Sequence, residues 1–119
     1  MGVIDSILRS NEYMESIMGD ILRVLALCMG ALWIDELYDE VNAFRISLGD
    51  SLISRSDVDE AIGRLRDIGL ITIEDRIKAG EFGEGVRSKL VSLKDLGDVY
   101  IYIRLDDRYN RYKELLREG

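Results

Sequence analysis

The chain has 119 residues, of which 47% are hydrophobic and 33% are charged, and its formal net charge at pH 7 is −7. This length and composition are typical of one globular domain, and no apolar run approaches the roughly 20 residues that cross a bilayer, so we expect no membrane partner. With one cysteine and no histidine, the chain lacks the residues of a disulfide, of a cysteine-based zinc site and of a histidine general base.

Neither catalysis nor secretion has support in the sequence. We find no nucleophile beside a base, and the acidic pairs within residues 35–40 fit a solvated helix face. The sequence therefore predicts a protein that is not an enzyme and that holds no metal or cofactor. The N-terminal MGVIDSILRS has no basic residue ahead of its apolar residues, which predicts no secretory signal and a cytoplasmic location. Many charged residues and no glutamine indicate a thermophile.

The first part of the chain predicts two helices. Apolar side chains recur at helical spacing through residues 3–29, and Ser10-Asn11 is placed to end a short first helix and to cap a second one. Gly30 then ends the second helix. Cys28 lies in the apolar stretch VLALCMG of this second helix, so we expect its thiol to be buried and inert.

Two further helices follow. Between residues 34 and 48 apolar side chains recur at i, i+3, i+4 and i+7, which predicts a helix that Gly49 ends. The stretch SRSDVDEAIGRLRDIGLI, residues 54–71, predicts another helix, with Ser56 as its N-cap and Gly69 at its end. Its expected buried stripe consists of Val58, Ile62 and Leu65.

The periodicity then changes to that of strands. LITIEDR and VRSKLVSL are rich in β-branched residues, and IKAGEFGEG between them contains three glycines. This pattern predicts an antiparallel hairpin with a long, flexible tip. Phe82 at the tip fits either an exposed contact residue or a side chain folded back onto the hairpin.

The last part of the chain fits two interpretations. DVYIYIRL, residues 98–105, alternates as a strand does, yet Leu96, Val99, Tyr100 and Ile103 also fit one face of a helix. We favour one helix from about 95 to 117 and keep the strand as the alternative.

The order of helices and hairpin resembles the winged helix-turn-helix family. SRSDVDEAIGRLRDIGLITI resembles the third helix and first wing strand of that family, and KLVSLKDLGDVY resembles its second wing strand leading into a final helix. The resemblance covers about residues 14–100. It implies a single α+β, mainly helical domain of residues 1–119, with a three-helix core and a two-stranded wing. Its parts are an N-terminal helical extension (1–13), the winged-helix core (14–94) and a C-terminal helix (95–119).

The resemblance implies a transcriptional regulator that binds double-stranded DNA through the third helix and the wing. Residues 1–54 are strongly acidic, whereas residues 55–94 contain as many basic as acidic residues, so a basic surface is expected only in the second region. The expected DNA contacts are Arg55, Arg64, Arg66, Arg76, Lys78, Arg87 and Lys89.

The third helix departs from this expectation in its charge. Its outward positions are Glu60, Gly63, Arg64 and Asp67, and Glu60 and Arg64 are spaced to pair with each other. Phosphate attraction supplies most nonspecific affinity, so this face offers little of it. The alternative function is a winged helix that binds a protein partner instead of DNA, as an interaction adaptor.

The family also implies dimers joined through terminal helices. The apolar run near the N-terminus and the tyrosines of the tail predict a homodimer held by the first and last helices, because one compact domain does not easily bury both. The expected interface residues are Ile4, Ile7, Leu8, Tyr100, Ile101, Leu105, Tyr109, Tyr112 and Leu116.

Overall fold

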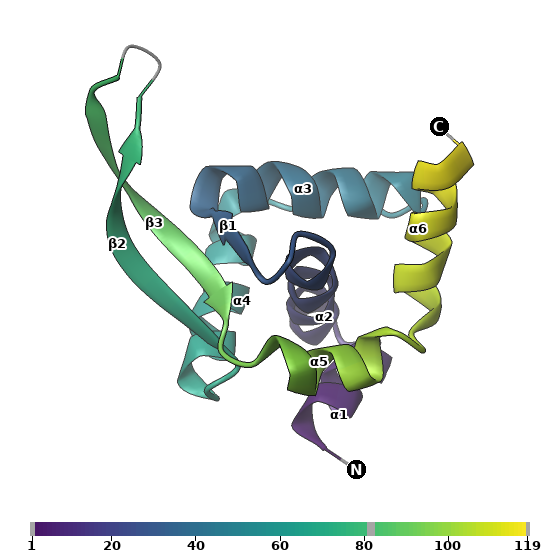
Figure 1. The fold of residues 1–119 in the computed structure, drawn as a ribbon. Helices are drawn as coiled ribbons and strands as arrows, with labels where there is room; N and C mark the ends of the chain where they lie inside the picture. Colours follow the sequence, from purple (N-terminus) through teal and green to yellow (C-terminus); the bar gives the residue numbers. More distant parts are fainter. Residues whose placement is uncertain (1, 81–82, 119) are drawn as a thin grey trace.

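The computed structural model describes residues 2–80 and 83–118, and within them the chain forms six helices and one three-stranded antiparallel sheet (Figure 1). The architecture is α+β and mainly helical, which confirms the predicted class. No helix of these residues is both long and apolar enough to cross a membrane. In chain order the elements are α1 (Val3–Arg9), α2 (Tyr13–Leu27), β1 (Ala31–Trp33), α3 (Ile34–Ser47), α4 (Arg55–Asp67), β2 (Ile71–Ala79), β3 (Gly85–Leu93), α5 (Leu96–Ile103) and α6 (Asp107–Glu118).

The core is organised around α2, against which α1, α3, α4 and α5 all pack (Figure 1). Most of the residues of α2 are buried, because beyond its first turn apolar side chains occur all around the helix. Each large apolar side chain that is fully buried contributes about 1.5–3 kcal/mol to folding. The predicted stripe of α4 is confirmed, since its three residues lie in the same core: Val58, Ile62 and Leu65.

Two helix starts differ from the predictions by two residues or fewer. The N-cap of α4 is Ser54, not Ser56, because the Ser54 hydroxyl accepts the backbone N–H of Asp57 at 3.1 Å and Ser56 already lies inside the helix. The N-cap of α2 is Glu12, whose carboxylate accepts the backbone N–H groups of Met14 and Glu15. These two backbone donors lower the pKa of Glu12.

Strand β1 was not predicted. Its three residues are only half-buried and follow a sharp turn in which Met29 and Gly30 both have positive φ. The strand pairs with β3, with Trp33 opposite Leu90, so that the sheet order is β1-β3-β2. The connection between α2 and α3 is thereby attached to the hairpin.

The predicted hairpin is confirmed as β2 and β3, whose register runs from Ile71 opposite Leu93 to Ala79 opposite Gly85. Its base is buried, whereas its far half projects from the body of the protein (Figure 1). Phe82 lies outside the described residues, so its two interpretations stay open.

The C-terminal region is helical, which confirms the favoured interpretation over the strand, but the single long helix is wrong. A turn at residues 104–106 separates α5 from α6. Asp106 causes this break, because its carboxylate accepts the backbone N–H of Tyr109 at 2.9 Å and both of its oxygens are bound by Arg23. Leu105 in the turn is 77% exposed.

Cys28 is half-buried, which corrects the prediction of a fully buried thiol. It is the C-cap of α2, where the helix reaches the surface. Partial burial, followed by the nearby carboxylates of Glu40 and Glu36, raises the pKa of the thiol, so the less reactive protonated form is favoured.

Candidate nucleic-acid interface

The outward face of α4 carries acids and small residues. Val58, Ala61, Ile62 and Leu65 are buried, so the opposite side of the helix faces solvent. At 100° per residue, that side is centred on Ser56, Glu60, Gly63 and Asp67. Gly63 leaves open space at the middle of this face, because a Cβ there would meet only Arg66 Nη2, at 4.0 Å.

Two tyrosines hold the first turn of α4. The Tyr13 hydroxyl of α2 donates a hydrogen bond to Asp57 at 2.6 Å, and the Tyr38 hydroxyl of α3 donates one to Asp59. Burial first, and then the Asp59 carboxylate, raise the pKa of Tyr38 to about 12. The two acids therefore have a structural role that does not involve a ligand.

Three expected DNA contacts lie on α4. Arg64 pairs with Glu60 at 2.9 Å, as the spacing predicted, and Arg66 is 3.4 Å from Asp67. Arg55 has no carboxylate within 4 Å among the described residues, and its guanidinium lies 4.8 Å above the centre of the Tyr38 ring.

The wing cations have acidic neighbours too. Arg76 pairs with Glu74 at 2.7 Å, and Lys89 lies 3.8 Å from Asp75. Lys78 reaches across to the first turn of α3, where it lies 3.8 Å from Asp35 and 3.4 Å from Glu36. Among the described residues, Arg87 is the one expected wing contact with no carboxylate within 4 Å.

The register divides these cations between the two faces of the hairpin. Arg87 is opposite Ile77 and Lys89 is opposite Asp75, so both project from one face. Arg76 and Lys78 project from the other face, on which Ser88 donates a hydrogen bond to Asp35 of α3. The structure therefore brings Arg87 and Lys89 together but does not gather all four cations into one basic strip.

The expected dimer residues are divided between core and surface. α1 and α6 both pack onto the protein's own core, and the centres of the Tyr112 and Phe44 rings are 4.8 Å apart. This packing buries Ile4, Ile7, Tyr109 and Tyr112 and partly covers Leu8, so the expectation that one domain does not bury both ends needs correction. The remaining expected residues are exposed: Tyr100, Ile101, Leu105 and Leu116.

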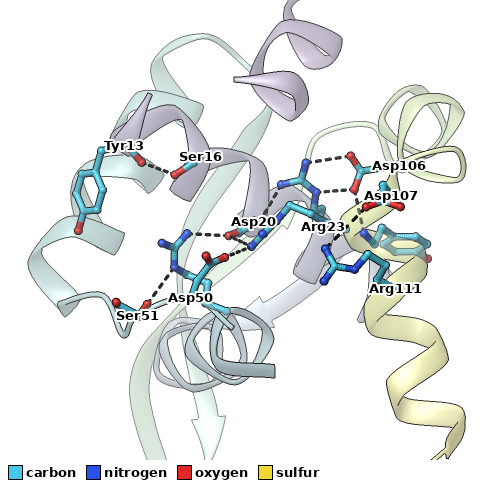
Figure 2. A network of polar contacts seen from close by, with 12 residues as sticks. Tyr13, Ser16, Asp20, Arg23, Asp50, Ser51, Asp106, Asp107 and Arg111 are labelled. Carbon is cyan, nitrogen blue, oxygen red and sulfur yellow. Dashed lines mark hydrogen bonds and ion pairs between the residues drawn. The ribbon is translucent and has the colours of Figure 1, made fainter. Parts of the chain in front are cut away.

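A buried charge network joins α2, α3 and α6 (Figure 2). Asp20, which is 1% exposed, binds Arg23, Arg45 and Arg108. This network was not predicted from the sequence, although a visible signal was present: Asp20 and Arg23 interrupt the mainly apolar, helical run of α2 at a spacing of i, i+3. Their partners lie far along the chain and cannot be found from local spacing.

The geometry thus offers a helix with an open, partly acidic face beside a projecting hairpin, on one face of which the exposed cations Arg87 and Lys89 lie together. A basic groove is not formed by the described residues. No protein-family model and no curated protein matches this chain.

Proposed function

We propose that the protein is a winged helix-turn-helix regulator that binds double-stranded DNA, with α4 as its recognition helix and the β2–β3 hairpin as its wing. The observation that carries the proposal is the succession of α2, α3, α4 and the hairpin, in which α4 packs one face on the core and leaves the other open beside the hairpin. A helix of 13 residues is about 20 Å long at 1.5 Å per residue, and the major groove admits such a helix.

In this proposal α4 recognises the bases and contributes little electrostatic attraction to the phosphates. Gly63 lets the helix axis approach the base edges closely, since no side chain stands at the centre of the face. In the proposal the exposed Arg66 binds guanine, while Glu60 accepts a hydrogen bond from the amino group of cytosine. The hydroxyls of Tyr13 and Tyr38 keep the helix in a fixed orientation.

Phosphate contacts then come from few residues per protomer. Arg55, Arg76, Arg87 and Lys89 are the exposed candidates on the hairpin and at the start of α4, whereas Lys78 is engaged with α3. Exposed ion pairs contribute only about 0–1 kcal/mol, so a phosphate can replace the acidic partner of Lys89 at small cost. The affinity should therefore fall with salt on a shallow slope of about 0.9 per neutralised phosphate.

The test is a fluorescence anisotropy titration of sheared genomic DNA fragments at several salt concentrations. The double variant Arg87→Glu/Lys89→Glu should abolish binding. The control Arg111→Glu/Arg117→Glu makes the same charge change on exposed residues of α6, on the other side of the body from the hairpin, and should bind better than the wing variant (Figure 1). No binding by the wild type even at low salt would contradict the proposal.

We propose that the regulator acts as a homodimer through the apolar residues that the fold leaves exposed on α5, on the turn after it and on α6. They include the expected interface residues Tyr100, Ile101, Leu105 and Leu116, and Leu96, Tyr102 and Leu115 are exposed there too. The rest of the surface is largely acidic, so two copies must meet where apolar area offsets like-charge repulsion. Light scattering at tens of micromolar tests this, and a monomer there would contradict it.

The charge pattern favours a second candidate, an adaptor that binds a basic protein. Five of the seven cations expected to contact DNA lie within 4 Å of a carboxylate. The outward face of α4 adds the exposed carboxylates of Glu60 and Asp67, which suit a partner rich in lysine and arginine. Affinity capture from cells, with DNA sequencing and mass spectrometry on the same eluate, separates the two candidates.

A further inference from the structure

A small polar pocket lies where the α1–α2 turn, α2, the end of α3 and the start of α6 meet. Its volume is about 230 Å³. Four arginines line it, Arg9, Arg23, Arg45 and Arg108, and Asp50 is the one acidic residue among its described lining residues. Such a concentration of guanidinium groups is unexpected in a chain whose net charge is −7.

The acids that hold three of these arginines, Arg23, Arg45 and Arg108, lie behind them. Asp20 is 1% exposed, and its two carboxylate oxygens accept hydrogen bonds from Arg23 Nη1 at 2.8 Å, Arg45 Nη1 at 2.8 Å and Arg108 Nε and Nη2 at 3.1 and 3.0 Å. Asp106 binds Arg23 from the α5–α6 turn (Figure 2). The guanidinium groups are therefore fixed before any ligand arrives, which lowers the entropic cost of binding.

Two guanidinium nitrogens are left over for a ligand. Arg45 Nη2 and Arg108 Nη1 have no hydrogen-bond partner among the described residues. Within that part of the chain, no buried side-chain nitrogen or oxygen lacks a partner, so both atoms must reach solvent. Arg45 is only 8% exposed and lines the pocket, so the pocket is where it meets solvent.

We propose that this pocket binds a small phosphate-class oxyanion. Guanidinium groups bind phosphate through paired, charge-assisted hydrogen bonds, which two fixed arginines with free nitrogens can offer. The volume is below the roughly 300–1,000 Å³ of pockets for drug-sized molecules, so it suits inorganic phosphate or the phosphoryl end of a larger molecule. This site is independent of whether α4 binds DNA.

Asp50 competes with the anion. Its carboxylate binds Arg108 Nη2 at 2.8 Å and is 39% exposed, so it occupies part of the positive site from the solvent side. An incoming phosphate must displace it or tolerate its charge. The wild-type affinity is therefore weaker than the arginines alone would give, and removal of the Asp50 charge should strengthen binding.

The pocket connects segments that matter for the rest of the fold. Arg45 and Asp50 flank the end of α3, just before the connection to α4, and Arg108 belongs to the first turn of α6. An anion bound to Arg45 and Arg108 would therefore link the α3–α4 connection to the C-terminal helix.

The test is a titration of the full chain with inorganic phosphate, followed by ¹H–¹⁵N NMR at constant pH and at an ionic strength held constant with sodium chloride. We expect saturable shifts at residues 9–16, 45–51 and 106–108. Asp50→Asn should tighten binding by about fivefold, the upper end of what one exposed charge pair contributes. Arg9→Glu should weaken it by a similar factor, and its side chain is 75% exposed, so the fold should be retained.

Arg117→Glu is the matched control, since it makes the same charge reversal at the far end of α6 and should leave phosphate affinity unchanged. A parallel titration with glycerol phosphate tells a free ion from a phosphoryl group on a larger molecule. Unsaturable shifts, or equal affinities in the wild type, Asp50→Asn and Arg9→Glu, would overturn the proposal.

Discussion

The substitution Gly63→Ala should stabilise the protein while it weakens the proposed function. Glycine in a helix interior costs about 0.8–1 kcal/mol relative to alanine, because glycine loses more backbone conformational freedom than alanine does when the chain folds. The added methyl group would meet only Arg66 Nη2, at 4.0 Å, which is ordinary contact and carries no penalty. We therefore expect the free energy of unfolding to rise by about 0.5–1 kcal/mol, or the melting temperature by roughly 2–4 °C for a chain of this length.

Urea unfolding followed by circular dichroism measures the first effect, and fluorescence anisotropy with genomic DNA measures the second. If α4 approaches a groove through this face, the methyl group separates the surfaces and the affinity falls although stability rises. A lower unfolding free energy would refute the reasoning, because it would mean that the space beside Gly63 is not open.

Gly19→Ala is the matched control in a helix of the core. There the new Cβ would lie 3.0 Å from Arg23 Nη1 and 3.4 Å from the carbonyl oxygen of Ile7. Arg23 would have to shift away from Asp20 and Asp106, so we expect destabilisation by about 1–3 kcal/mol in place of a gain. If Gly63→Ala raises the free energy of unfolding and Gly19→Ala lowers it, then the space around the new methyl group, and not helix propensity alone, decides the effect on stability.

Three further predictions follow from the contacts. Asp20→Asn should destabilise by about 3–5 kcal/mol in urea unfolding, because buried arginines lose their carboxylate, and a loss below 1 kcal/mol would contradict the network. The pKa of Tyr38 is raised from 10.0 to about 12 in the folded protein. Its contribution to the free energy of unfolding is therefore complete below pH 10 and is lost as the pH rises to 12. Tyr38→Phe should remove this pH dependence of the free energy of unfolding between pH 10 and 12. Leu105→Glu should convert a dimer to a monomer in light scattering with little change in melting temperature, since this side chain is exposed in the single chain.

Periodicity predicted the elements whose burial repeats regularly. α3 and α4 each bury one stripe, α2 is apolar at helical spacing along most of its length, and β2 and β3 are rich in β-branched residues, so local pattern was sufficient. β1 was not predicted because three residues are too few to show the alternation of a strand, and because its pairing partner β3 lies nearly sixty residues away in the sequence. The break at Leu105 was not predicted for a related reason. It depends on the contact between Asp106 and Arg23, which are 83 residues apart in the sequence.

The candidate site was predictable in its residues but not in its electrostatics. The sequence identified Lys78 and Lys89 as expected DNA contacts, and the hairpin register follows from the two strands. That Lys78 is drawn to Asp35 and Glu36 depends on how the hairpin leans toward α3, which only tertiary packing decides. The arginine pocket was invisible for the same reason, since its four arginines come from α1, α2, α3 and α6.

The location of the arginines links the core to the surface. Arg23 and Arg45 are two of the three basic residues before Arg55, and both are largely buried with Asp20, so Arg9 is the one basic side chain among the described residues before Arg55 that is mostly exposed. The body of the protein is therefore strongly acidic on its outside, and DNA is repelled from it at ranges up to about the Debye length, roughly 10 Å in 0.1 M salt. The edge formed by α4 and the hairpin, where basic and acidic residues are equal in number, would repel DNA less. In the proposed complex the acidic body would then restrict the orientation in which the protein approaches DNA, and the few cations at one edge would make a weak contact whose affinity falls with salt on a shallow slope.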